Sequence, residues 1–365
     1  MLIHAGHKML LRLLRLALDN AELSEESIEM LDAAGWHQLI RTATMGGVAS
    51  LAFDGYVKSG LNDSPDCPLN SKKMRKLRLS WMGLEIPQRK NYERQLKVLR
   101  KLQTFFHRHG IEMQVLKGYP LSLCYPKPEL RTASDIDIYC AEDYDRSNKL
   151  IEKTGVTVDY SQHKHSVFTI EGVPVENHYH FLNVHGHRSS RQLEKLLHEK
   201  GISSPSATLL YLLRHSAENF TASQGRIRQV IDCGLYARKY NADIDWQWLC
   251  DTATLVGMKQ YVDIVFAICV RCLGFSASLF PECEVDSELL NRSFNDILCP
   301  EFNDEHPANI MAELIYKMRR WRSNMWKHRI VYANENLMTT FLTQAWSHVL
   351  KPSSIVYGMR EGKRE

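Results

Sequence analysis

The spacing of apolar residues changes twice along this chain, and the change limits the folds that the chain can adopt. Near both ends, apolar residues recur at helical spacing, as in helices that are buried on one side. In the middle they alternate with polar residues, most strictly over Asp135–Cys140. We therefore predict an α+β fold in which N- and C-terminal helical regions flank a small mixed β-sheet. The expected parts are a helical region at 1–84, an α/β core at 85–189 and a helical domain at 190–365.

The expected core combines one long helix with four short strands. A polar helix is predicted over 85–109, because apolar residues fall on one of its faces at helical spacing. The predicted strands are Ile111–Leu116, Asp135–Cys140, His165–Ile170 and Val173–Phe181. Only Glu171-Gly172 separates the last two strands, which predicts a tight β-hairpin.

The composition is that of an ordinary globular protein and excludes several other classes. With 365 residues, 44% hydrophobic and 24% charged, the chain can form buried cores and is not expected to be disordered. Its net charge of +4 is too small to mark a nucleic-acid-binding protein, so nucleic acid is not an expected partner. The apolar runs are too short for a membrane span, so no membrane partner is expected. The nine cysteines follow no regular framework, which favours free thiols and a cytoplasmic location.

Residues suited to phosphate chemistry gather in one segment of the middle region. Because alternate residues of a strand share a face, Asp135 and Asp137 bring two carboxylates close together. Two such groups repel unless a cation lies between them, and oxygen ligands favour Mg²⁺ or Mn²⁺. Lys117 and Gly118 end the preceding strand, where a residue without a Cβ lets the backbone approach a phosphate. Arg131 carries the planar guanidinium that binds phosphate oxygens in pairs.

This pattern resembles the nucleotidyltransferase superfamily of the polymerase-β type, and more closely a bacterial family of uncharacterised nucleotidyltransferase-like proteins. The hallmark of that family is Leu-Lys-Gly, followed by an arginine and then by Asp-Ile-Asp. The similar residues here are Leu116-Lys117-Gly118, Arg131 and Asp135-Ile136-Asp137. A later strand of the family carries an acid and a nearby histidine, to which Glu176-Asn177-His178 is similar. Downstream helices of the family carry a histidine, a basic residue and an aspartate, which resemble His215, Arg226 or Arg228, and Asp232.

The resemblance implies an enzyme that transfers a nucleotidyl group from a nucleoside triphosphate to an acceptor, with Mg²⁺ or Mn²⁺ as cofactor. The catalytic and metal-binding residues that it implies are Asp135, Asp137 and Glu176. The nucleotide-binding residues that it implies are Lys117, Gly118, Arg131 and His178. The acceptor is expected to be a small molecule, a sugar or a protein.

Two other functions stay open at this point. A degenerate nucleotide-binding or scaffold protein is favoured by Tyr119, where the superfamily usually has glycine or serine, and by the long interval between Gly118 and Asp135. A metal-dependent hydrolase is the other, because histidines spaced in pairs along strands suit a Zn²⁺ site. These histidines are His163, His165, His178, His180, His185 and His187. Two of them, His178 and His180, are expected on the same face of their strand as Glu176.

Overall fold

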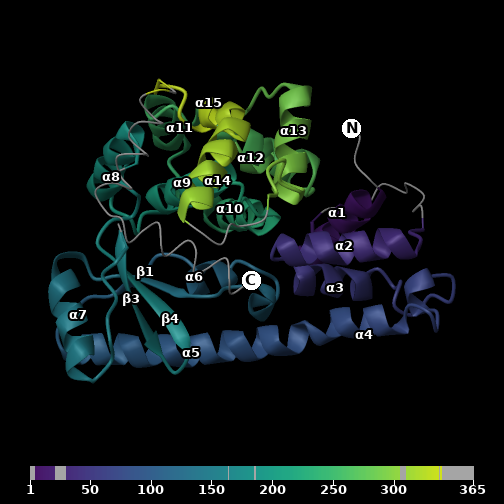
Figure 1. Ribbon diagram of the computed structural model, residues 1–365, viewed down its shortest axis with the longest axis horizontal. Coiled ribbons are helices and arrows are strands. Elements are labelled where there is room, and N and C mark those ends of the chain that lie inside the picture. Colours follow the sequence, from purple (N-terminus) through teal and green to yellow (C-terminus); the bar gives the residue numbers. More distant parts are fainter. Residues whose placement is uncertain are drawn as a thin grey trace.

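A small β-sheet lies between a long helix and a group of C-terminal helices in the computed structural model of the chain (Figure 1). The first three helices, drawn in purple, lie beside this arrangement, near the N-terminal end of the long helix. The structure describes residues 5–20, 30–162, 164–184, 186–304, 310–336 and 338. This mixture of helices with one small mixed sheet among the described residues confirms the predicted α+β class.

The sheet has four strands in the order β1-β2-β4-β3. Strands β2 (Ile136–Tyr139) and β4 (Val173–His178) are parallel and occupy the centre. Strand β1 (Gln114–Val115) pairs antiparallel with β2 at one edge. Strand β3 (His165–Ile170) pairs antiparallel with β4 at the other edge, which confirms the predicted hairpin. The sheet therefore places β2 and β4, the two strands that carry acidic residues, next to each other.

One face of the sheet is mostly apolar and packs on helices α5 (Glu85–Arg108) and α7 (Tyr144–Lys153). Ile136 and Ile138 of β2 point to this face and are buried with Val175 of β4 and with apolar residues of α5. Because strand residues alternate, Asp137, which lies between the two isoleucines, points to the opposite face. Burial of the isoleucines thus determines which side of the sheet carries the acidic residues.

The N-terminal helices pack closely on one another. They are α1 (Ala5–Ala17), α2 (Ala33–Met45), α3 (Ala49–Lys58) and α4 (Arg75–Gly83). Gly55 of α3 touches the backbone of α1, where a Cβ at this position would lie 1.9 Å from the Leu13 carbonyl oxygen. Glycine is therefore required for this crossing, because any side chain would push the two helices apart.

The C-terminal helices share one continuous buried core with the N-terminal helices. They are α8 (Arg188–Lys200), α9 (Pro205–Thr221), α10 (Ile227–Tyr240), α11 (Trp246–Leu255), α12 (Lys259–Arg271), α13 (Ser287–Leu298), α14 (Ile310–Ser323) and α15 (Met325–Val331). Ser204 caps α9 by accepting a hydrogen bond from the Ala207 amide at 3.3 Å.

Short 3₁₀ turns lie at Pro68–Asn70, Pro128–Leu130, Ala141–Asp143, Asn241–Asp243 and Ala277–Leu279. Among the described helices, none is long and apolar enough to cross a membrane.

The prediction for the end of β4 was wrong, and the reason lies in α8. The strand was expected to run to Phe181 but ends at His178. The backbone amides of Phe181 and Leu182 donate hydrogen bonds to the Glu194 carboxylate at 3.0 and 2.9 Å. A side chain from α8 thus satisfies the amides that a longer strand would have paired within the sheet. Strand β1 is also shorter than expected, since only Gln114–Val115 of the predicted segment pairs with β2.

Candidate active site

Three carboxylates converge on the polar face of the sheet. Asp137 of β2 lies opposite Glu176 of β4 in the parallel register, so their side chains leave the same face at the same height. Asp135 directly precedes β2 and lies on the same face as Asp137. A carboxylate oxygen from each of the three lies within 4.8 Å of the others. The structure thus brings together the three acidic residues that the sequence predicted.

The Asp137 carboxylate has one oxygen with two partners and one oxygen with none. Its Oδ1 lies 3.0 Å from Lys117 Nζ and 3.0 Å from His178 Nε2. Its Oδ2 is buried and has no hydrogen-bond partner among the described residues. Burial opposes ionisation, but Lys117 and then His178 outweigh it and lower the pKa of Asp137. Asp137 is therefore an anion at neutral pH with one oxygen available to bind a cation.

Lys117 reaches Asp137 from the end of β1. Its ammonium is largely buried, which lowers the pKa, but the Asp137 carboxylate outweighs that effect and raises the pKa of Lys117 above its usual value. The next residue, Gly118, has a φ of +79° and is the N-cap of the short helix α6 (Tyr119–Ser122). That backbone conformation favours glycine, so the Lys117-Gly118 turn depends on a residue without a Cβ.

Two histidines accompany Glu176. His178 Nε2 lies 3.4 Å and His165 Nδ1 lies 3.5 Å from Glu176 Oε2. Burial raises the pKa of Glu176, but the hydrogen bond from His178 and the charge of Lys117 outweigh it, so the pKa is lowered. Burial lowers the pKa of His178, but Asp137 and Glu176 outweigh it and raise the pKa. For His165, burial and the nearby His178 lower the pKa to about 2, so this ring is neutral.

Arg131 lines the same region but is held by a carboxylate of the C-terminal helices. Its Nε and Nη2 donate to Asp232 Oδ1 and Oδ2 of α10 at 2.7 and 2.9 Å. The Tyr125 hydroxyl also donates to Asp232 Oδ1, at 2.8 Å. Burial lowers the pKa of Arg131, but Asp232 outweighs it and raises the pKa. The sequence predicted Arg131 as a phosphate ligand and named Asp232 as a family match, but it did not predict that the two are bound to each other.

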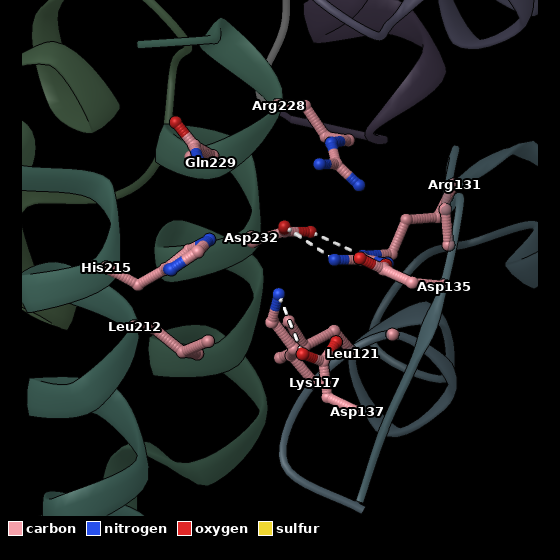
Figure 2. A pocket seen from close by; sticks show the side chains of 12 residues that line it. Lys117, Leu121, Arg131, Asp135, Asp137, Leu212, His215, Arg228, Gln229 and Asp232 are labelled. Carbon is pink, nitrogen blue, oxygen red and sulfur yellow. Dashed lines mark hydrogen bonds and ion pairs between the residues drawn. The ribbon is translucent and has the colours of Figure 1, made fainter. Parts of the chain in front are cut away.

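A narrow cleft with a free volume of about 40 Å³ lies between the polar edge of the sheet and helices α9 and α10. Figure 2 shows that residues of α9 and α10 face the Asp135–Asp137 segment across this space. Its lining residues are Lys117, Gly118, Leu121, Arg131, Ala133, Asp135, Asp137, Leu212, His215, Arg228, Gln229 and Asp232. Arg228 donates a hydrogen bond to the Thr132 carbonyl oxygen, while its buried Nε has no hydrogen-bond partner among the described residues. Burial and then Lys117 lower the pKa of His215 well below its usual value, so a neutral ring borders the cleft.

The predicted site residues fall into three groups. Asp135, Asp137, Glu176, Lys117 and His178 form one cluster, and Gly118 and Arg131 line the cleft beside it. His180 was expected on the same face as Glu176 but instead lies 3.2 Å from Glu194, because β4 ends before it. His163 and His185 lie outside the described residues.

His165 is the site neighbour whose position the sequence analysis did not derive. It lies opposite His178 in the antiparallel register of the hairpin. A two-residue turn at Glu171-Gly172 fixes that register, so counting back from the turn would have paired the two histidines. The signal was therefore present in the sequence.

The comparisons with known proteins agree with this geometry. A family model described as uncharacterised nucleotidyltransferase matches residues 32–274. The matched range includes every residue of the carboxylate cluster and of the cleft. No curated protein and no solved structure matches the chain.

Proposed function

Since the chain belongs to the family of uncharacterised nucleotidyltransferases, we propose that it transfers a nucleotidyl group from a nucleoside triphosphate to an acceptor hydroxyl, with Mg²⁺ or Mn²⁺. The observation that carries this proposal is the convergence of Asp135, Asp137 and Glu176 within 4.8 Å. These donors are all carboxylate oxygens, the ligands that Mg²⁺ and Mn²⁺ prefer. Asp137 Oδ2 is buried and has no hydrogen-bond partner among the described residues. A bound cation would account for this, because burying a charged oxygen without a partner costs free energy.

In this proposal Asp135, Asp137 and Glu176 hold the cation. A divalent cation at such a site lowers the pKa of an attacking hydroxyl and stabilises the charge of the pyrophosphate that leaves. Lys117 and His178 fix the orientation of Asp137 through its Oδ1 and leave the other oxygen for the cation.

The cleft supplies the groups that triphosphate binding needs. Gly118 has no Cβ at the turn that borders the cleft, so its backbone is accessible to phosphate oxygens. Arg228 of α10 and Arg131, which precedes β2, line the cleft with guanidinium groups. The proposed acceptor is a molecule that offers a hydroxyl: a small molecule, a sugar or a protein.

The bond between Arg131 and Asp232 favours a second candidate, a nucleotide-binding protein without turnover. In the structure the guanidinium of Arg131 donates two hydrogen bonds to the Asp232 carboxylate, which neutralises its charge. If Arg131 stays bound to Asp232 when a nucleotide binds, its charge does not neutralise the phosphates. The two candidates differ in one product, pyrophosphate.

Pyrophosphate release tests the proposal. The full-length protein is incubated with each nucleoside triphosphate, Mg²⁺ and a panel of hydroxyl acceptors that includes sugars and peptides. We expect release with the wild type and its loss in Asp135→Asn, whose partly exposed side chain makes folding of the variant expected. Asp143→Asn is the matched control, because this surface carboxylate follows the same strand and pairs with Arg146 at 3.2 Å. Nucleotide binding without any pyrophosphate would favour the second candidate.

A further inference from the structure

A second group of potential metal ligands shares Glu176 with the acidic cluster. His165 of β3 lies opposite His178 of β4, and Glu176 is on the same strand face as His178. One ligand atom from each of His165, Glu176 and His178 lies within 4.8 Å of the other two. Two imidazole nitrogens and one carboxylate oxygen form a donor set different from the three carboxylates of the neighbouring cluster.

The distances from Glu176 to the two histidines fit a tetrahedral ion. Glu176 Oε2 lies 3.4 Å from His178 Nε2 and 3.5 Å from His165 Nδ1. Ligands bound at about 2.0–2.2 Å to a tetrahedral Zn²⁺ are about 3.3–3.6 Å apart. The two separations thus have the length of edges of a zinc coordination tetrahedron. Three protein ligands are also the number found where zinc keeps one position for water or substrate.

The orientation of the His178 ring also fits metal binding. Its Nδ1 lies 3.2 Å from the His180 carbonyl oxygen, which can only accept, so Nδ1 carries a hydrogen and donates it. Its Nε2 then faces the carboxylates of Asp137 and Glu176 at 3.0 and 3.4 Å. The lone pair of this Nε2 would be repelled by the two carboxylates unless a positive charge lies between the nitrogen and the carboxylate oxygens. That charge is either a proton or a metal ion. An Nδ1 hydrogen bond to a backbone carbonyl is the common support of a zinc-bound histidine.

His165 distinguishes a metal ion from a proton. Its side chain is about nine-tenths buried, and its Nδ1 has no hydrogen-bond partner among the described residues. A proton on His178 would leave this buried nitrogen unsatisfied, whereas an ion between the three ligands would engage it. Buried polar atoms are almost always partnered, so an unpartnered nitrogen aimed at Glu176 needs an explanation.

We propose that His165, Glu176 and His178 form a binding site for a divalent transition metal of the Zn²⁺ type. Imidazole nitrogens suit Zn²⁺ and its first-row neighbours, whereas Mg²⁺ prefers oxygen. Glu176 belongs to both ligand groups, so the transition metal lies beside the cation of the acidic cluster. A metal ion on His178 Nε2 would replace the contact of that nitrogen with Asp137 and leave Lys117 to orient the carboxylate. The inference goes beyond nucleotidyl transfer and is tested without substrate, because it concerns metal affinity alone.

Metal titration of the full-length protein tests this site. The protein is stripped with a chelator and titrated with Zn²⁺, and then with Co²⁺, whose visible spectrum reports tetrahedral nitrogen ligation. We expect one equivalent of Zn²⁺ to bind to the wild type. His165→Gln should weaken binding by about 100-fold or more, because even an outer partner of a metal ligand contributes about 10–100-fold. Glu176→Gln should weaken both Zn²⁺ and Mg²⁺ binding, and Asp135→Asn only the latter.

His180→Gln is the matched control, because this histidine follows β4 but pairs with Glu194. It should bind Zn²⁺ as the wild type does. Equal Zn²⁺ affinity of the wild type and His165→Gln would overturn the proposal, as would a Zn²⁺ site that Asp135→Asn removes and His165→Gln retains. If His165→Gln does not fold, His165→Asn replaces it. A wild-type Co²⁺ complex without a tetrahedral spectrum would overturn the proposal by itself.

Discussion

Asp137 and Glu176 lie directly opposite each other on the parallel strands β2 and β4, and both carboxylates leave the face of the sheet that borders the cleft. Ile136 and Ile138 fix this direction, because their burial against α5 forces the residue between them to the other side. The position of the site thus follows from the packing of the sheet on its helix.

Removing the Asp137 carboxylate is expected to destabilise the fold as well as the site. From the repulsion between adjacent carboxylates alone, Asp137→Ala would leave stability unchanged or raised. In the structure, however, the variant leaves the largely buried Lys117 without its 3.0 Å partner. Loss of one member of a buried ion pair costs about 3–5 kcal/mol. Chemical denaturation should show this loss, and an Asp137→Ala variant as stable as the wild type would contradict the structural role of the pair.

The pair of Arg131 and Asp232 is expected to couple the sheet to α10. Arg131→Met should lower the free energy of unfolding by about 3–5 kcal/mol, because it leaves Asp232 buried without its cation. The double variant Arg131→Met/Asp232→Leu should lose less than the sum of the two single variants. Denaturant titration of the four proteins gives the coupling energy. Additive losses would show that the two side chains do not interact.

Gly118 is expected to resist substitution because of its backbone conformation. Its φ of +79° strains any residue with a Cβ, so Gly118→Ala should cost about 1–3 kcal/mol. Gly83 provides the control, because it ends α4 without a positive φ and with open space around its Cβ position. Gly83→Ala should be neutral or stabilising. Thermal unfolding of both variants checks the difference, and equal effects would contradict it.

Acid stability is expected to depend on Glu335. Burial raises the pKa of this carboxyl, but hydrogen bonds from His187 and Ser189 outweigh it and lower the pKa from 4.5 to about 2. A lowered pKa in the folded state stabilises the fold above the unfolded pKa, and this stabilisation is lost as the pH falls towards 2.

The wild type should therefore exceed Glu335→Gln in stability by about 3 kcal/mol near neutral pH and by little near pH 2. Denaturant titration from pH 7 down to pH 2 measures this difference. Glu199→Gln, at an exposed position of α8, should show no such dependence. A difference between wild type and Glu335→Gln that stays constant over this range would contradict the role of the ionised carboxylate.

The sequence predicted the parts of the site that depend on local patterns. The alternation over Asp135–Cys140 indicated a strand and the face that its aspartates share, and the structure has both. The turn at Glu171-Gly172 indicated the hairpin that carries Glu176. In these segments the local period and the tertiary packing require the same arrangement.

The parts that the sequence did not predict depend on contacts between distant residues. Asp232 binds Arg131 across 101 positions, and no local pattern encodes that pairing. Glu194 ends β4 from a different element, although the sequence of the strand continues to alternate. Helix α13 at Ser287–Leu298 was not predicted at all, although Asp286 caps it through the Leu289 amide.

The central claim is that the carboxylate cluster binds a nucleoside triphosphate together with a divalent cation. The most direct test is thermal unfolding of the wild type, Asp135→Asn and Asp143→Asn with ATP, GTP, CTP or UTP, each with and without Mg²⁺. A nucleotide at about 100 times its Kd should stabilise the protein by about 2.7 kcal/mol. We predict a Mg²⁺-dependent rise in Tm for the wild type and Asp143→Asn that is absent in Asp135→Asn. No rise with any nucleotide, or an equal rise in Asp135→Asn, would contradict the account.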